Sequence, residues 1–188
     1  MKLSSLQVRK FAREFQVLDL TGNGTIEWED LARGVENLAR LSGWAEDAPE
    51  REAFLGRRRE LWRLLTSAAD RNHDGRISLE EYVVFWARVL AQAGGDRAHV
   101  PKWFGHLIMT CFDALDLDKN GVIGRDDYAR FLKAHGVQID VDACFARLDH
   151  NGDGVISRKE GLELFLDFTM SADPAAPGNW LWGPIQES

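Results

Sequence analysis

Four twelve-residue segments share one pattern of oxygen-bearing residues, and this repeat constrains the fold more than any other feature of the chain. Each segment begins with Asp, has Asn or Asp at position 5, Gly at position 6 and Ile at position 8, and ends with a carboxylate at position 12. The segments, which we call loops one to four, are Asp19–Asp30, Asp70–Glu81, Asp116–Asp127 and Asp149–Glu160. Four such matches within 188 residues are not expected by chance.

The spacing within each segment suits a hard divalent cation. Ca²⁺ takes six to eight oxygen ligands at roughly 2.3–2.6 Å. Side chains at positions 1, 3 and 5 surround one side of the ion, position 7 supplies its backbone carbonyl, and the carboxylate at position 12 returns from the start of the next helix. Glycine adopts the positive φ that position 6 needs, and Ile at position 8 is expected to form a short strand with the partner loop. This is the EF-hand calcium loop.

The predicted ligands occupy positions 1, 3, 5, 7 and 12 of each loop. In loop order they are Asp19, Thr21, Asn23, Thr25 and Asp30; Asp70, Asn72, Asp74, Arg76 and Glu81; Asp116, Asp118, Asn120, Val122 and Asp127; and Asp149, Asn151, Asp153, Val155 and Glu160. Loops two and four end in Glu, which can give two oxygen atoms to the ion. We therefore predict that these two loops are the tightest Ca²⁺ sites.

Loops one and three end in Asp, whose side chain is one methylene shorter. Asp127 favours contact through one oxygen or a smaller cage, and Mg²⁺ prefers six ligands at about 2.0–2.1 Å, so we expect Mg²⁺ as well as Ca²⁺ in loops one and three. Loop one should be weakest, because Thr21 replaces the usual Asp or Asn at position 3, although Glu27 at position 9 could compensate directly or through water. The alternative is a degenerate loop one that only pairs with loop two.

Composition excludes several classes of function. The formal charge is −7, and the eleven carboxylates at positions 1, 3, 5 and 12 of the loops more than account for it, so we predict no nucleic-acid partner. The run Arg57–Arg59 is expected to be a solvated helix face, with a docking patch as the alternative. No apolar run is long enough to cross a bilayer, so we predict no membrane association and a cytoplasmic location. The histidines form no recognisable pair with a nucleophile, which predicts a non-enzymatic protein.

Helical periodicity flanks every loop, and this predicts an all-α fold of two EF-hand pairs packed into one compact globule. The expected units are an N-terminal pair at residues 1–93, a C-terminal pair at 94–170 and a non-helical tail at 171–188. Gly94, Gly95 and Pro101 break any continuous helix between the pairs, so the halves are expected to fold onto each other. Cys111 and Cys144 lie in the helices before loops three and four and are expected to be free thiols.

The tail contains three prolines, which exclude a helix, and also Trp180, Leu181, Trp182 and Ile185. Leaving this apolar surface in water is costly, at about 25 cal/mol per Å². We therefore expect the tail to pack against the body, with Trp180, Leu181 and Trp182 buried between the halves; the alternative is a disordered end. The seven Trp and ten Phe residues are expected to fill the core, or alternatively to line a cavity for a small apolar ligand.

The chain resembles the sarcoplasmic calcium-binding proteins, and among them the bacterial calerythrins. The resemblance lies in the four EF-hand loops, the long segment between loops one and two, the broken centre and the tail sequence Gly178–Pro184. It implies a compact cytosolic protein that binds Ca²⁺ and often Mg²⁺. Photoproteins are similar in layout, but they have a His where this chain has Arg13, and they need Tyr hydroxyls near the C-terminus, so light emission is not expected.

These observations favour a Ca²⁺ buffer or transporter that acts as a monomer. The first alternative is a Ca²⁺ sensor that opens a groove for a target protein, but the scarcity of Met and the covering tail do not support such a target. The second alternative is a Ca²⁺-gated carrier of a small apolar ligand, which needs only an internal cavity.

Overall fold

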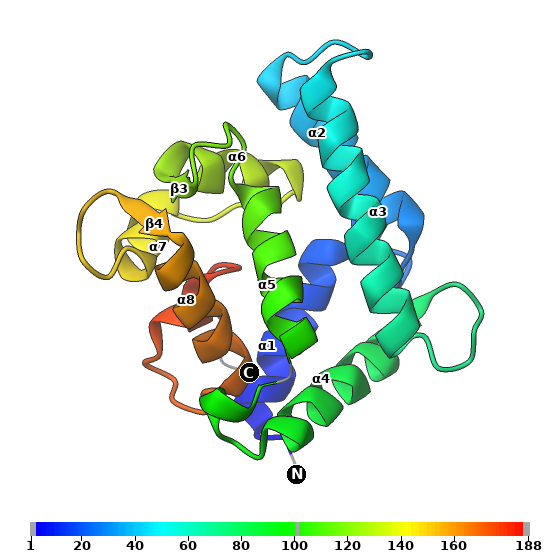
Figure 1. Ribbon diagram of the computed structural model, residues 1–188, viewed down its shortest axis with the longest axis vertical. Coiled ribbons are helices and arrows are strands. Elements are labelled where there is room, and N and C mark those ends of the chain that lie inside the picture. Colours follow the sequence, from blue (N-terminus) through cyan, green and yellow to red (C-terminus); the bar gives the residue numbers. More distant parts are fainter. Residues whose placement is uncertain (1–2, 101, 186–188) are drawn as a thin grey trace.

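The computed structural model describes residues 3–100 and 102–185, and its elements form four helix–loop–helix units (Figure 1). The predicted break at Pro101 and the last three residues of the predicted tail lie outside the described residues. The elements are α1 (Ser5–Leu18), β1 (Thr25–Ile26), α2 (Trp28–Ser42), α3 (Pro49–Ala69), β2 (Ile77–Ser78), α4 (Leu79–Ala93), the 3₁₀ turn η1 (Arg97–His99), α5 (Lys102–Leu115), β3 (Val122–Gly124), α6 (Arg125–Ala134), α7 (Val141–Leu148), β4 (Val155–Ser157), α8 (Arg158–Met170) and the 3₁₀ turn η2 (Pro177–Trp180). The predicted all-α class is confirmed.

Each pair of loops meets in a short antiparallel ladder at position 8. In the first pair, Ile26 of β1 lies opposite Ile77 of β2. In the second pair, Ile123 of β3 lies opposite Ile156 of β4. All four isoleucines are buried, as expected for β-branched side chains on the inner face of a ladder. The predicted pairing of loop one with loop two, and of loop three with loop four, is therefore confirmed.

The larger of two hydrophobic clusters among the described residues runs through both halves of the molecule. Phe11 of α1 stacks on Trp86 of α4 with ring centroids 5.2 Å apart, and it meets Phe168 of α8 edge-on at 6.3 Å. Trp86 also meets Phe104 of α5 at 5.6 Å. Aromatic contacts thus connect helices from the two halves, and α4 ends at Gly94 in a left-handed conformation. The compact arrangement predicted from the sequence is confirmed.

Buried polar side chains of α1 form hydrogen bonds with the C-terminal end of α8. Lys10 of α1 is fully buried, and its Nζ donates to the backbone carbonyl of Ser171 at 2.8 Å, just beyond the end of α8. Gln7 donates from Nε2 to the carbonyl of Met170 at 3.3 Å. Burial lowers the pKa of Lys10 to about 8. These contacts satisfy carbonyl groups that a helix end leaves without an internal partner.

The tail lies along α7 and α8, where Leu181 and Trp182 are buried. Trp182 contacts Phe131 of α6 and Phe165 of α8, with ring centroids 5.8 Å and 6.3 Å away. From the other half, Arg13 of α1 donates through Nε to the carbonyl of Trp182 at 3.0 Å.

Two details of the tail differ from the sequence prediction. Residues Pro177–Trp180 form one 3₁₀ turn where a wholly non-helical tail was expected. Trp180 is only half-buried, and the guanidinium of Arg147 stacks on its ring, 4.1 Å from the ring centroid. An aromatic ring that stacks on a cation does not need complete removal from water. Within the described residues, no helix is both long and apolar enough to span a membrane.

Candidate metal sites

In every loop the glycine at position 6 lets the chain fold back onto the first aspartate. The φ angles of Gly24, Gly75, Gly121 and Gly154 are 84°, 79°, 90° and 88°. In this conformation each glycine amide donates to Oδ2 of the Asp at position 1, at distances of 2.9, 3.1, 3.0 and 2.8 Å in loop order. Glycine is required because a side chain at such φ values is strained.

The carboxylate at position 12 of each loop is also the third residue of the exiting helix. It accepts a hydrogen bond from the backbone amide at position 9, which precedes the helix. The pairs are Glu27 N to Asp30 Oδ2 at 2.7 Å, Ser78 N to Glu81 Oε2 at 3.0 Å, Gly124 N to Asp127 Oδ2 at 3.1 Å and Ser157 N to Glu160 Oε2 at 3.0 Å. Helix capping therefore fixes this carboxylate at the rear of each loop.

The side chains at positions 3 and 5 lie together at the open side of the loops. In loop two, Asn72 donates from Nδ2 to Asp74 Oδ2 at 2.9 Å, and in loop four Asn151 donates to Asp153 Oδ2 at 3.0 Å. The oxygen at position 5 also accepts the amide of position 7, as Asp74 Oδ1 does from Arg76 at 2.9 Å. These loops thus gather oxygen atoms from residues one, three and five of the predicted set.

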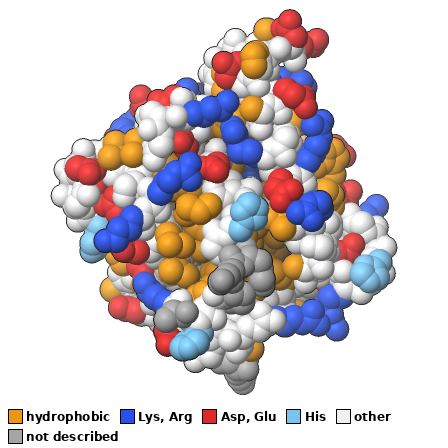
Figure 2. Space-filling model, in the orientation of Figure 1, with side chains coloured by type: hydrophobic (Ala, Val, Ile, Leu, Met, Phe, Trp, Pro, Cys, Tyr) orange, Lys and Arg blue, Asp and Glu red, His pale blue; other side chains and the backbone are white. Residues whose placement is uncertain are grey.

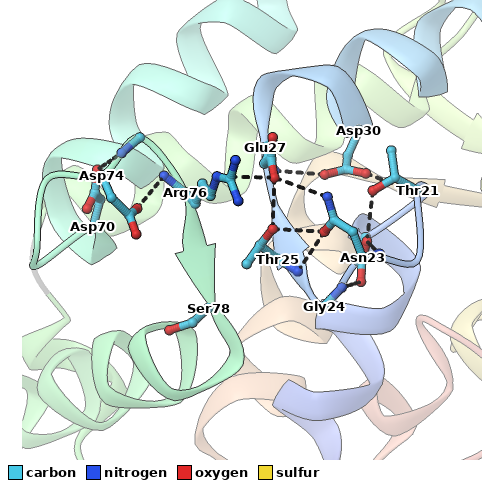
Figure 3. Close-up of polar contacts among 12 residues, drawn as sticks. Thr21, Asn23, Gly24, Thr25, Glu27, Asp30, Asp70, Asp74, Arg76 and Ser78 are labelled. Atoms are coloured by element: carbon cyan, nitrogen blue, oxygen red, sulfur yellow. Dashed lines mark hydrogen bonds and ion pairs between the residues drawn. The ribbon is translucent and has the colours of Figure 1, made fainter.

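Loop one has a weaker version of the same arrangement, shown in Figure 3. At position 3, the hydroxyl of Thr21 donates to Asp19 Oδ1 at 3.3 Å. Because this hydroxyl is neutral, position 3 adds no negative charge to the loop. Asp30 is fully buried, and its Oδ1 accepts the amide of Thr21 at 2.8 Å. Glu27 is turned across the loop, where its Oε1 accepts from Asn23 Nδ2 at 3.0 Å and from the Thr25 hydroxyl at 2.9 Å.

The carboxylate at position 12 is more deeply buried in loop three than in loop two. Asp127 is buried, and burial raises its pKa above the ordinary value, with smaller contributions from Asp118 and Asp116. Glu81 is half-exposed, and hydrogen bonds led by the amide of Ser78 lower its pKa. A buried carboxylate must lose its proton to bind a metal, and the bound cation then stabilises its ionised form.

The donor set fits Ca²⁺. Every predicted side-chain ligand offers a carboxylate, amide or hydroxyl oxygen, and oxygen atoms are the ligands that Ca²⁺ and Mg²⁺ take. Within the described residues, no cluster of three or more His, Cys, Asp or Glu side chains is arranged to hold a metal. Each loop combines its ligand carboxylates, of which loops two to four have three each, with amide, hydroxyl or backbone carbonyl oxygens. A soft metal that needs thiolate or imidazole ligands does not fit here.

A cavity of about 40 Å³ lies at the centre of the molecule, between the halves. Aromatic and aliphatic side chains line it together with Glu14 of α1, Arg58 of α3 and Trp182 of the tail. Burial raises the pKa of Glu14 to about 7, and polar contacts led by Tyr82 partly oppose this shift. Burial also lowers the pKa of Arg58 to about 10. Cys111 lines the cavity as well, and both cysteines are free thiols, as predicted.

Sequence reasoning missed Glu14 and Arg58. The signal for Glu14 was present, because it lies three residues after Phe11 and four before Leu18, and therefore falls within the apolar stripe of α1. Arg58 belongs to the run that was expected to be a solvated helix face. That expectation is wrong for this residue, which is buried against His135 with Arg58 Nη2 3.4 Å from His135 Nε2.

Comparisons with known proteins match EF-hand families to the segments that carry the loops. The EF-hand domain pair family matches residues 107–166, and the EF hand family matches residues 12–35 and 67–86, so the matched segments contain all four loops. Luciferin-binding protein of Renilla reniformis is 32% identical over 185 residues, which cover 95% of this chain and 94% of that protein. Calerythrin of Saccharopolyspora erythraea is 24% identical over 160 residues, covering 85% and 89% of the two chains. The structure of a sarcoplasmic calcium-binding protein from amphioxus matches with a TM-score of 0.74 and 25% identity over 100% of both chains.

Helix–loop–helix units that pair through short ladders and carry these acidic loops define the EF-hand class of calcium-binding proteins. The chain belongs to this class, and within it to the family of sarcoplasmic calcium-binding proteins and calerythrin. Its relatives are calcium-binding proteins and not enzymes, in agreement with the predicted non-enzymatic character.

Proposed function

We propose that the protein is a cytoplasmic, monomeric Ca²⁺ buffer. The predicted ligands at positions 1, 3, 5, 7 and 12 bind the ion in all four loops, most tightly in loops two and four. Loops one and three also take Mg²⁺, because their terminal carboxylates, Asp30 and Asp127, are short and buried. The two EF-hand pairs, residues 1–93 and 94–170, act as one body that the tail holds closed.

The observation that carries this proposal is how few large hydrophobic side chains are exposed in the part of the chain that the structure describes. Among the described residues, the large hydrophobic side chains classed as exposed are Val8 and Leu79, each with 41% of its surface accessible. On the face seen in Figure 2, acidic and basic side chains are interspersed, and hydrophobic side chains show in small groups between them. A sensor of the calmodulin type presents a continuous Met-rich groove to its target. In this chain the corresponding apolar surface is covered by Leu181 and Trp182.

A hydrophobic dye tests buffer against sensor. The metal-free chain is titrated with Ca²⁺ while the fluorescence of the dye is recorded, and the titration is repeated in millimolar Mg²⁺. A buffer binds the ion without a rise in dye fluorescence. A rise in step with Ca²⁺ occupancy would show that a groove opens, and would support the sensor instead.

The second candidate is a Ca²⁺-gated carrier of a small apolar ligand. It is favoured by the central cavity, in which Glu14 Oε2 and Arg58 Nε are buried without a hydrogen-bond partner among the described residues. The similarity to luciferin-binding protein points the same way. Against it, drug-sized ligands need pockets of about 300–1,000 Å³, while this cavity measures about 40 Å³. A carrier would need the halves to separate, so quenching of Trp fluorescence by an aromatic ligand in a Ca²⁺-dependent manner would favour this function.

A further inference from the structure

The ladder between loops one and two places two opposite charges face to face. Thr25 lies opposite Ser78 and Ile26 opposite Ile77, so the next residues in the antiparallel register are Glu27 and Arg76. Arg76 Nε lies 3.5 Å from Glu27 Oε1, and the side chain of Arg76 reaches from loop two to loop one (Figure 3). The contact therefore follows from register, and joins position 9 of one loop to position 7 of the other.

The contact is peculiar to this pair of loops. In the C-terminal ladder, Gly124 lies opposite Val155 at the same two positions. Neither residue carries a charge, and position 9 of loops two and four is Ser. Of the four loops, only loop one has a carboxylate at position 9, which is Glu27. Only loop two has a charged side chain at position 7, which is Arg76. The second half of the molecule serves as an internal reference that lacks this pair.

Loop one has few negatively charged ligands. Its residues at positions 3 and 5 are Thr21 and Asn23, so Asp19 and Asp30 are its charged ligands, and Glu27 supplies the third negative charge. The Glu27 side chain is 25% exposed and is already held by two hydrogen bonds from within the loop. The affinity of an EF-hand loop depends on the charge of its ligands. A permanent positive charge against Glu27 therefore acts on the loop where one charge matters most.

We propose that Arg76 of loop two lowers the Ca²⁺ affinity of loop one further, by competing with the ion for the carboxylate of Glu27. The proposal rests on the proposed function, since it takes loop one to be a Ca²⁺ site. The guanidinium neutralises Glu27 when loop one is free of metal. When Ca²⁺ enters, Glu27 must leave Arg76 to approach the ion directly or through water, and the nearby cation opposes the entry. A residue of loop two thus contributes to the later filling of loop one.

The four glycine amides allow each loop to be followed separately. Gly24 donates to Asp19 and Gly75 donates to Asp70, both of which are predicted ligands, so the NMR resonance of each amide reports on its own loop. The chain is titrated with Ca²⁺ alone, as wild type, R76M and R71M. Arg71 is an exposed residue at position 2 of loop two, so R71M removes the same charge without breaking the contact with Glu27.

The expected result is that R76M moves the Gly24 midpoint to a lower Ca²⁺ concentration, by up to about fivefold, which is the upper range for a partly exposed ion pair. R71M is expected to move it clearly less. The variant E27Q is expected to weaken loop one, and adding R76M to E27Q should then cause no further shift beyond that of R71M.

Other outcomes overturn the proposal. Equal Gly24 midpoints in the wild type, R76M and R71M would contradict it, and the proposed function would stand if the other three glycines respond. A Gly24 resonance that no Ca²⁺ concentration moves in any variant would show that loop one is not a site, and would also overturn it. If none of the four glycines responds, the proposed function itself fails.

Discussion

Tyr128 of α6 donates its hydroxyl to the backbone carbonyl of Trp180 at 2.9 Å, and the carbonyl of Leu181 lies 3.2 Å from the same oxygen. The Tyr128 side chain is almost fully buried, and burial raises its pKa well above the ordinary value, so the hydroxyl remains a donor. One hydroxyl thus satisfies carbonyls on the segment of the tail that covers the core. From the N-terminal half, Arg13 donates to the carbonyl of Trp182. The tail is therefore fixed by polar contacts from both halves.

Shortening the chain before Pro174 should expose the surface that Leu181 and Trp182 cover. Each buried Trp removes roughly 150–250 Å² from water, worth several kcal/mol at about 25 cal/mol per Å². We expect the shortened chain to bind a hydrophobic dye and to melt at a lower temperature in Ca²⁺. The milder variant Y128F should cost about 1 kcal/mol of unfolding free energy, since it removes only the hydroxyl. A shortened chain as stable and as dye-silent as the intact one would contradict the role of the tail.

The tail approaches α8 so closely that one position tolerates no side chain. A Cβ added at Gly178 would lie 2.2 Å from the carbonyl oxygen of Leu164 and 2.6 Å from the amide of Phe168, both of which are backbone atoms. G178A should therefore destabilise the fold by about 1–3 kcal/mol. Gly56, within α3, has open space around it, so G56A should stabilise the fold by roughly 0.5–1 kcal/mol. Denaturant unfolding of the two variants checks both signs, and equal effects would disprove the close contact.

The buried carboxyl of Glu14 should make stability depend on pH. Its pKa is about 7 in the folded chain and 4.5 ordinarily, so the folded chain holds the proton more tightly than the unfolded chain. The contribution of Glu14 to stability should then fall as the pH rises from about 4.5 to 7 and level off above that. The variant E14Q cannot ionise, so its stability relative to wild type should improve by roughly 3 kcal/mol across this window.

The stability of E14Q and wild type is measured in the presence of a metal chelator, so that metal binding does not contribute. The exposed Glu46 provides the matched control, because E46Q should show no such trend. The neutral His135, whose pKa burial lowers to about 3, remains the same in both proteins and cancels in the comparison. A constant difference between E14Q and wild type from pH 4 to pH 8 would show that Glu14 is not held protonated.

The short carboxylate of loop three should set its choice of cation. In D127E the longer side chain can give two oxygen atoms, so Ca²⁺ binding should gain relative to Mg²⁺. Calorimetric titration of Ca²⁺ with and without Mg²⁺ measures this ratio. The control D126E lengthens the exposed neighbour, which caps no loop. An unchanged ratio in D127E would remove the basis for a mixed site.

Features that depend on a few neighbouring residues were predicted from the sequence. Ile26, Ile77 and their counterparts predicted that each loop pairs with a partner through a short strand, because a β-branched residue at this position favours a ladder. The break at Gly94 was equally local, since this glycine ends a helix with positive φ. The fold class and the loop geometry thus followed from short-range patterns.

Features that depend on several elements at once were not predicted. Glu14 is buried by side chains from α3, α4, α5 and the tail, and no local pattern states how these surround it. The Arg76–Glu27 contact needed the register of two strands that are far apart in the sequence. Trp180 was expected to be buried, but its neighbour Arg147 makes a half-exposed position favourable. Local spacing is therefore sufficient for the loops and insufficient for the centre of the molecule.

Calorimetric titration of the metal-free chain with Ca²⁺ in millimolar Mg²⁺ tests the central claim, that the loops bind the ion as assigned, most directly. The wild type should show two tight equivalents from loops two and four, with weaker binding from the Mg²⁺-accepting loops. E160Q should lose one tight equivalent, because the amide gives up the two-oxygen contact, while E163Q, an exposed change one turn further along α8, should lose none. An E160Q titration identical to that of the wild type would contradict the assignment of the ligands.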